Sequence, residues 1–276
     1  MFELPEYTIL ARQINKTLVG KTVKKGNLGN SPHKFVWYNR KHDEFKKLTR
    51  GKVVGKARVQ GRWLMVPLEP GYNMVLGECG GRILYHPANS ERPEKYHLCL
   101  EFEDGSSFTA TTQMWGAMEL YEAGKEQERQ YIKDMRVTPV EKAFTFKYFS
   151  GLIDELLKGK KRSTKSLLTQ DQLIPGLGNA SAQDILFGAH LLPRRALSEL
   201  SSGQRRDLYD SIVDTVREII DKGGRNDETD LFGKWGGYVR LMDSGAVGKP
   251  CPECGTRIQR LQYLGGACYF CPKCQV

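Results

Sequence analysis

The chain has 276 residues, of which 39% are hydrophobic, and it carries a formal net charge of +10 with a sequence pI of about 9.2. This composition excludes a disordered chain, and no apolar run approaches the roughly 20 residues of a membrane span. The positive charge favours a polyanionic partner such as nucleic acid.

The N-terminus gives no sign of a secretory signal, because Glu3 and Glu6 stand where an apolar segment would be needed. We therefore expect a cytoplasmic, nucleoid-associated monomer without a membrane partner. Five of the seven cysteines fall within residues 251–276. An odd number that is clustered in this way indicates a local metal site in a reducing compartment rather than a disulfide framework.

The first 20 residues place apolar side chains at helical spacing, which predicts a helix from about Glu6 to Leu18, closed by Gly20. Between Val23 and about Tyr121, short apolar or alternating stretches are separated by glycine and proline. This pattern predicts a β-sandwich or barrel. Trp63 and Trp235 are both expected to be core residues.

From about Phe144 the pattern becomes helical, with apolar residues three and four positions apart, and the seven glycines of residues 223–248 indicate a loop. We therefore predict an α+β chain. It would comprise an N-terminal β-sandwich domain with a leading helix (1–125), a helical domain (140–245) and a small zinc-binding module (246–276).

Two C-x-x-C motifs, CPEC at 251–254 and CPKC at 271–274, are separated by 16 residues. This spacing supplies four thiolates for one tetrahedral Zn²⁺ and leaves no open position, so the predicted metal is structural. The intervening segment predicts a hairpin around Gly265 and Gly266. The expected ligands are Cys251, Cys254, Cys271 and Cys274.

The segment PGLGNASAQDILFGAHLLPRR (175–195) combines a glycine-rich turn with a helix, and Asn179 stands where an N-cap belongs. Backbone N–H groups at such a turn can hold a phosphate. Five basic residues lie just upstream in KGKKRSTK (158–165), so a helix–turn–helix that clamps a DNA backbone is one interpretation. Two packed helices with a solvated basic loop is the other.

These segments together resemble the formamidopyrimidine-DNA glycosylase and endonuclease VIII family of base-excision repair. ELPE opens the chain, PGLGNASAQDILFGAHLLPRR is similar to the family's helix–two-turn–helix, and CPECGTRI with YFCPKCQ is similar to its zinc finger. The three motifs occur in the family's order, so the resemblance covers essentially the whole chain. It implies damaged DNA as the partner, a DNA N-glycosylase and AP lyase type of activity, and one structural zinc.

The resemblance also implies that the N-terminus performs the chemistry. In the family, methionine is removed, and the amine of a proline at position 2 forms a Schiff base with C1′ of a flipped-out nucleotide. An α-amine suits this role because its pKa is roughly 7.7–8.0, against about 10.4 for lysine. The next glutamate, which is Glu3 here, protonates the opened sugar. The alternative role for Glu3 is to cap the first helix or pair with a buried basic group.

The departures from the family fall on its catalytic positions. Phe2 replaces the proline, and because methionine aminopeptidases need a small second residue, we expect Met1 to be retained. The amine then belongs to Met1. The family's hairpin lysine corresponds to Arg62, which keeps the charge but is a poor proton donor. The zinc-finger arginine corresponds to Gly265 or Gly266.

Candidate DNA contacts follow from the same resemblance. Glu78 stands where an apolar wedge is usual, and Met114 and Trp115 stand near the other two wedge residues, where Trp115 would still stack. The remaining candidates are the phosphate-contact matches Lys165 and Asn179, the weak match His97, and the hairpin cation Arg260.

Three hypotheses remain open from the sequence. The chain is a glycosylase with altered catalytic residues, in which Glu3 activates water or another amine replaces the proline. Alternatively, it is a non-catalytic damage- or structure-specific DNA-binding protein on the same scaffold. Thirdly, it is a zinc-bearing RNA-binding or interaction protein. A borohydride-trapped adduct separates the first two, and a preference for RNA over DNA identifies the third.

Overall fold

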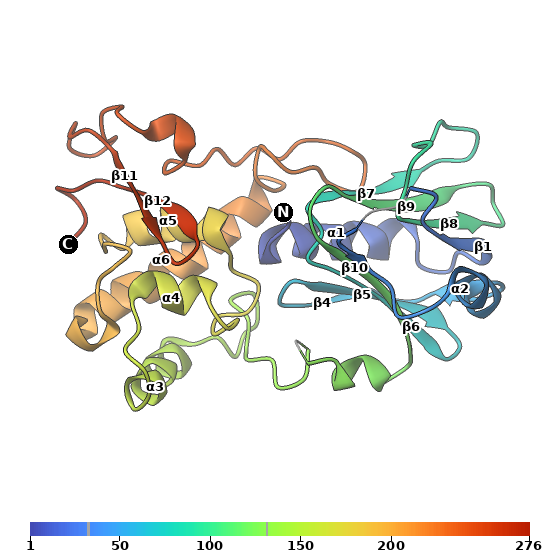
Figure 1. Cartoon of the computed structure of the whole chain (residues 1–276), viewed down its shortest axis with the longest axis horizontal. Helices are drawn as coiled ribbons and strands as arrows, with labels where there is room; N and C mark the ends of the chain where they lie inside the picture. The colour runs from blue at the N-terminus through green and yellow to red at the C-terminus, as the bar shows by residue number, and fades with distance from the viewer. Residues whose placement is uncertain (32–33, 131) are drawn as a thin grey trace. The chain divides into compact units, whose positions relative to one another are not determined.

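The computed structural model describes residues 1–31, 34–130 and 132–276 (Figure 1). The chain divides into two compact units, one of residues 1–135 with 219–238 and the other of residues 136–218 with 239–276. The three-domain division at 1–125, 140–245 and 246–276 stays a prediction. Within the described ranges, no helix has the length and apolar character needed to cross a membrane.

The first unit is a β-sandwich with a leading helix, which confirms the fold predicted from the strand pattern. A short 3₁₀ turn, Lys125–Glu128, follows the last strand. Its helices and strands are α1 (Leu4–Thr17), β1 (Val23–Leu28), β2 (Val36–Trp37), α2 (His42–Thr49), β3 (Val53–Val54), β4 (Arg58–Gln60), β5 (Trp63–Glu69), β6 (Tyr72–Gly77), β7 (Gly81–His86), β8 (Leu98–Phe102), β9 (Ser107–Thr112) and β10 (Gly116–Glu122).

Two sheets form the sandwich. In the described residues, one sheet has the order β1-β8-β9-β7, and the other has the order β2-β10-β6-β5-β3 with β4 paired to β5. The pairs are antiparallel except that β2 lies parallel to β10, with Trp37 opposite Ala117. In the strand order, β2 is the first strand, so it lies at the edge of its sheet.

Alternate side chains of β5 point to opposite faces of its sheet, and both faces of this strand are buried. Leu64, Val66 and Leu68 point into the main core, which also takes side chains from α1. Trp63 and Met65 point the other way, into a smaller cluster closed by Ile132 after the last strand. A strand buried on both faces has a nearly continuous apolar sequence, as WLMVPL does.

The leading helix begins two residues earlier than predicted, at Leu4, because Glu3 takes the N-cap position and Pro5 suits the first turn. Ahead of it, Phe2 is 0% exposed and belongs to the main core. The helix α2 was not predicted, since it lies within a region otherwise made of strands. It is amphipathic and buries only Phe45 and Thr49.

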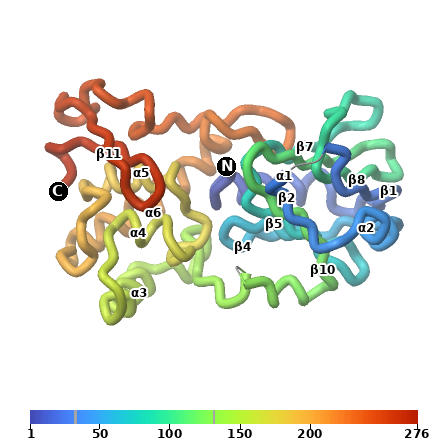
Figure 2. Tube along the Cα trace, viewed as in Figure 1, coloured from blue at the N-terminus to red at the C-terminus, as the bar shows by residue number. Residues whose placement is uncertain are grey.

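The second unit is helical and ends in a two-stranded hairpin, as predicted (Figure 2). The hairpin turn lies at Leu264 and Gly265, because Gly266 already belongs to the second strand. Its elements are α3 (Phe146–Leu157), α4 (Thr164–Thr169), α5 (Asn179–Gly188), the 3₁₀ turns Leu197–Glu199 and Ser244–Ala246, α6 (Ser202–Asp221, whose last three residues belong to the first unit), β11 (Gln259–Tyr263) and β12 (Gly266–Phe270).

Replacing Phe2 by alanine should destabilise the first unit by about 3–5 kcal/mol, because it removes a fully buried ring from a packed core. Urea unfolding followed by circular dichroism measures this loss. Phe232→Ala is the control, since that ring is 55% exposed and its loss should cost no more than about 1 kcal/mol. Equal effects of the two substitutions would contradict a core role for Phe2.

Candidate functional site

Phe2 is fixed as a core residue by both its backbone and its ring. Its N–H donates to the carbonyl of Cys79 at 3.0 Å, and its ring meets Tyr7 edge-to-face at 5.7 Å between centroids. The Tyr7 hydroxyl accepts in turn from the Cys79 N–H at 3.1 Å. Burial raises the pKa of the Cys79 thiol to about 12, so this cysteine stays neutral. The nitrogen of residue 2 is therefore an amide that is already hydrogen-bonded.

The free α-amine belongs to Met1, and it forms an ion pair with Glu228. Met1 itself is exposed, in contrast to the buried Phe2 that follows it. A Cβ added at Gly80 would lie 3.8 Å from the Cβ of Met1 and 4.0 Å from that of Met114. Gly80 is thus adjacent to both side chains, and the amine lies between the exposed Met1 side chain and the buried Glu228 carboxylate.

Arg225 organises the groups around this amine. The guanidinium is 2% exposed and donates to the two carboxylate oxygens of Glu6 at 2.9 and 3.0 Å. It also donates to the carbonyl oxygen of Met1 at 2.8 Å. Its nitrogens lie 3.8 Å from carboxylate oxygens of both Glu3 and Glu228. One buried cation therefore holds the backbone of Met1 and faces three carboxylates.

The positive charges of Arg225 and the Met1 ammonium partly neutralise the three carboxylates around them. Neighbouring carboxylates, Glu6 and Glu3 foremost, outweigh the burial of Arg225 and raise the pKa of its guanidinium, so it remains charged. Burial raises the pKa of the Glu228 carboxyl, and the Met1 ammonium and Arg225 oppose that rise. We define Met1, Glu3, Glu6, Arg225 and Glu228 as the N-terminal charge cluster.

Both alternatives raised for Glu3 are present in the structure. Glu3 is the N-cap of α1 and forms a capping box with Glu6, whose carboxylate accepts from the Glu3 N–H at 2.9 Å. Its own carboxylate also lies beside Arg225. These contacts give Glu3 a structural role and place its carboxyl in the same cluster as the amine.

Arg62 and Glu78 lie next to this cluster and pair with each other. Arg62 occupies the turn between β4 and β5, and its guanidinium is 3.2 Å from the Glu78 carboxylate. The same guanidinium is 4.0 Å from the sulfur of Met1. The structure thus brings Met1, Arg62 and Glu78 together.

The remaining candidates of the first unit differ in exposure. His97 is buried, and its Nδ1 accepts from the Thr112 N–H at 2.9 Å, so the ring holds the end of β9 in place. Met114 and Trp115 are exposed on the turn between β9 and β10. Trp115 stacks on Trp37 with the ring planes 6° apart.

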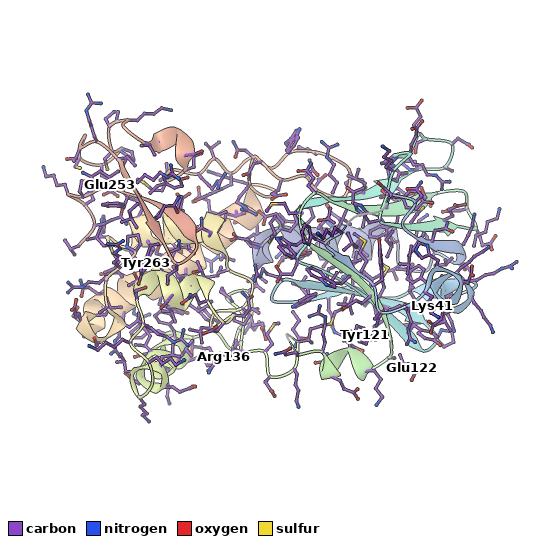
Figure 3. The ribbon with its side chains drawn as sticks, in the orientation of Figure 1. Lys41, Tyr121, Glu122, Arg136, Glu253 and Tyr263 are labelled. Atoms are coloured by element: carbon purple, nitrogen blue, oxygen red, sulfur yellow. The ribbon has the colours of Figure 1, made fainter. Side chains whose placement is uncertain are left out.

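In the second unit, Lys165 and Asn179 contact the hairpin. Lys165 is 1% exposed, and its ammonium donates to the carbonyls of Tyr263 at 2.7 Å and Gly266 at 3.3 Å. Figure 3 labels Tyr263, the last residue of β11. The Asn179 amide donates to the carbonyl of Ala267 at 3.3 Å. The prediction that Asn179 is the N-cap is wrong, because Gly178 occupies that position and Asn179 is the first helical residue.

The four predicted zinc ligands converge at the base of the hairpin. Their sulfurs all lie within 4.8 Å of one another, and the pairs Cys251–Cys274 and Cys254–Cys271 are 3.8 and 3.5 Å apart. Tetrahedral Zn–S bonds of about 2.3 Å require sulfurs about 3.8 Å apart, so this donor set fits one structural zinc. Cys268 lies apart on β12 as a buried packing residue, and Arg260 on β11 is exposed.

Sequence reasoning missed Arg225 and Glu228, because both lie in a glycine-rich segment that was interpreted only as a loop. The signal available was the concentration of charge in GGRNDETD, which a solvated loop explains equally well. The prediction that Trp235 is a core residue is wrong, since 55% of it is exposed, whereas Trp63 is buried as expected.

A β-sandwich with a leading helix, a helical unit and a hairpin with four clustered cysteines together define the class of fold, and comparison with known proteins identifies the family. The protein-family model for the formamidopyrimidine-DNA glycosylase N-terminal domain matches residues 1–117. The family model for the formamidopyrimidine-DNA glycosylase H2TH domain matches residues 136–229. The chain belongs to the formamidopyrimidine-DNA glycosylase family.

Relatives align over the full length of the chain. The formamidopyrimidine-DNA glycosylase of Desulfitobacterium hafniense is 27% identical, and the alignment covers 100% of both chains. The formamidopyrimidine-DNA glycosylase of Ligilactobacillus salivarius is 28% identical, and the alignment covers 100% of this chain and 99% of the relative. A solved complex between the Lactococcus lactis Fpg and an abasic site containing DNA has a TM-score of 0.83 at 23% identity, covering 99% of each chain. The MutM (Fpg) protein of Thermus thermophilus has a TM-score of 0.82 at 25% identity, covering 99% of this chain and 98% of its own.

Replacing Arg225 by methionine should destabilise the protein by about 3–5 kcal/mol at neutral pH, because it leaves buried carboxylates without their cation. Without that cation the carboxyls have raised pKa values in the folded state, so part of the loss should be recovered as the pH falls and they become protonated. Urea unfolding at several pH values measures both effects. Arg217→Met is the control, since that guanidinium is exposed and pairs with Asp214 at 3.9 Å.

Purified protein should contain one zinc per chain by elemental analysis, and Cys254→Ser should lose it. Removing the metal with a chelator should unfold the hairpin, because such a short segment buries too little apolar surface to fold alone. Cys268→Ala is the matched control and should keep the metal, since that cysteine lies in the same hairpin outside the four-sulfur cluster. Full metal content in Cys254→Ser would contradict this assignment.

Proposed function

We propose that this chain is a DNA glycosylase of base-excision repair that acts on oxidised bases with altered catalytic residues. In this proposal the α-amine of Met1 takes the place of the family's proline amine. The observation that carries it is the N-terminal charge cluster, in which Glu228 pairs with the amine and Arg225 holds the adjacent carbonyl. An amine held in one position loses less freedom on reaching its target than a flexible chain end does.

Three groups of the cluster, Met1, Glu3 and Glu228, have proposed roles in the reaction. Glu228 accepts the proton of the Met1 ammonium, and the neutral amine attacks C1′ of the damaged nucleotide. The N-glycosidic bond breaks, and the base leaves with the bonding electron pair and takes up a proton. Glu3 protonates the ring oxygen of the sugar as the ring opens to a Schiff base. Loss of a C2′ proton then breaks the C3′–O bond and releases the 3′-side strand, which carries the phosphate at its 5′ end.

The DNA contacts remain proposals. The exposed or half-buried candidates are suited to direct contact with DNA, because their side chains can reach it. His97 and Lys165 act on DNA through the segments that their side chains hold in place. The proposed direct contacts are Arg62, Glu78, Met114, Trp115, Asn179 and Arg260.

A second function, damage-specific DNA binding without catalysis, is favoured by one observation. The nitrogen at position 2, which is the nucleophile in the family, is here an amide that donates to the Cys79 carbonyl. If the Met1 amine does not react either, the scaffold retains recognition alone.

The test is to incubate the protein with duplex DNA containing an abasic site, reduce with borohydride and map any adduct. Intact mass first establishes that Met1 is the first residue. Trypsin releases MFELPEYTILAR (1–12), which contains no lysine, so an adduct on this peptide can only involve the α-amine. We expect the adduct on this peptide.

Two further measurements make this test decisive. Glu228→Gln should lower the rate of adduct formation about 10- to 100-fold, because the ammonium loses its proton acceptor. Lys234→Gln, a change to a charged residue of the same loop outside the cluster, is the control. An adduct on a lysine would assign a different nucleophile, and tight binding without adduct or base release would support the second function.

A further inference from the structure

Three aromatic side chains form a continuous exposed stack on the first unit. The Trp37 and Trp115 rings are 5.3 Å apart between centroids with planes 6° apart, and Phe35 packs on Trp115 at 4.6 Å. Trp37 is 48% exposed, and the other two are exposed to a similar extent. We call Phe35, Trp37 and Trp115 the aromatic platform.

The platform is held by backbone contacts rather than by one flexible loop. Phe35 and Trp37 flank Val36 on the edge strand β2, and the Gly116 N–H donates to the Phe35 carbonyl at 3.1 Å. Trp115 comes from the turn between β9 and β10, and its carbonyl accepts from the Gly80 N–H at 3.4 Å. These hydrogen bonds hold the backbone segments that carry Phe35 and Trp115.

The same contacts place the platform near the N-terminus. Gly80 adjoins both Met1 and Met114, and Met114 precedes Trp115 in the chain. Gly80 thus connects Met1 to the segment that carries Met114 and Trp115, all within the first unit.

Charge indicates what such a surface accepts. The Lys34 ammonium lies 6.0 Å from the centroid of the Phe35 ring, and the chain carries a net charge of +10. Exposed aromatic rings next to a cation suit a nucleotide, because the rings stack on the base and the cation attracts the phosphate. A protein partner would favour an apolar surface without this charge.

We propose that the aromatic platform binds an unpaired nucleobase of single-stranded DNA. Trp37 supplies the main stacking face, and Trp115 packs against the Trp37 ring while remaining exposed itself. Trp115 is thus already engaged in a stack, so it serves as part of a preformed surface rather than as a mobile wedge. This inference rests on the proposed function and extends it, because it assigns a substrate class: damaged DNA with unpaired bases close to the lesion.

The probe is an oligothymidine of about ten nucleotides, a length within the range that single-stranded binding sites occupy. Its affinity is measured by quenching of tryptophan fluorescence and by anisotropy of a labelled strand. Trp37→Ala should weaken binding between about 5-fold and about 150-fold, which corresponds to the loss of one base–aromatic stack. Trp37→Phe keeps a ring and should lose less.

Trp235→Ala is the matched control. This tryptophan is also exposed on the first unit, but it packs beside Arg82 and lies outside the platform. Its replacement should change the affinity less than 2-fold. Circular dichroism and unfolding transitions establish that all three variants fold like the wild type.

The outcomes separate this inference from the function on which it rests. Loss of affinity in Trp37→Ala with the control unchanged supports the platform. Equal affinities in Trp37→Ala and wild type, or wild-type binding to abasic duplex but not to oligothymidine, overturn the platform and leave the glycosylase proposal intact. If the wild type forms no adduct and binds neither DNA, both fail. A dimer that Trp37→Ala abolishes would assign the platform to self-association and overturn the inference.

Discussion

The buried ion pair between Arg225 and Glu6 is the interaction on which the N-terminal region depends. It joins positions 219 residues apart and is nearly sealed from solvent, so water cannot replace either partner. Taking these charges out of water is costly. The cost is offset because both guanidinium–carboxylate hydrogen bonds are well formed and a further N–H of the guanidinium reaches the Met1 carbonyl. One pairing thereby fixes the helix start, the returning loop and the first peptide of the chain. The position of the Met1 amine follows from it.

Much of the architecture could be predicted because it depends on local patterns. Strand alternation, helical spacing and the two C-x-x-C motifs are all patterns among residues close in sequence. The structure has the sandwich, the helices and the four-sulfur cluster that these patterns predict. The unpredicted helix α2 is short and buries only two side chains, which is too weak a pattern to stand out among strands.

The candidate site was less predictable, because its key contacts join distant segments. The sequence shows a phenylalanine at position 2, but it did not reveal that this phenylalanine is a core residue and that Met1 lies outside the core. The sequence placed Lys165 at a phosphate-contact position. It did not reveal that the Lys165 ammonium donates hydrogen bonds to backbone carbonyls of the hairpin. Arg225 and Glu228 carried no motif at all. In each case the residue type was visible, whereas its partner was determined only by the folded chain.

The pairing of Met1 with Glu228 has a consequence for how the protein can be made. Any affinity tag or leader fused ahead of Met1 converts its ammonium into an uncharged amide, and Glu228 then faces Arg225 without its second cation. Such a fusion would bring extra chain to the position where a nucleotide is proposed to react, and it would remove the attacking nitrogen while leaving every encoded residue unchanged. A preparation tagged at this end would therefore lack the nucleophile of the proposed reaction, so purification handles belong at the other terminus.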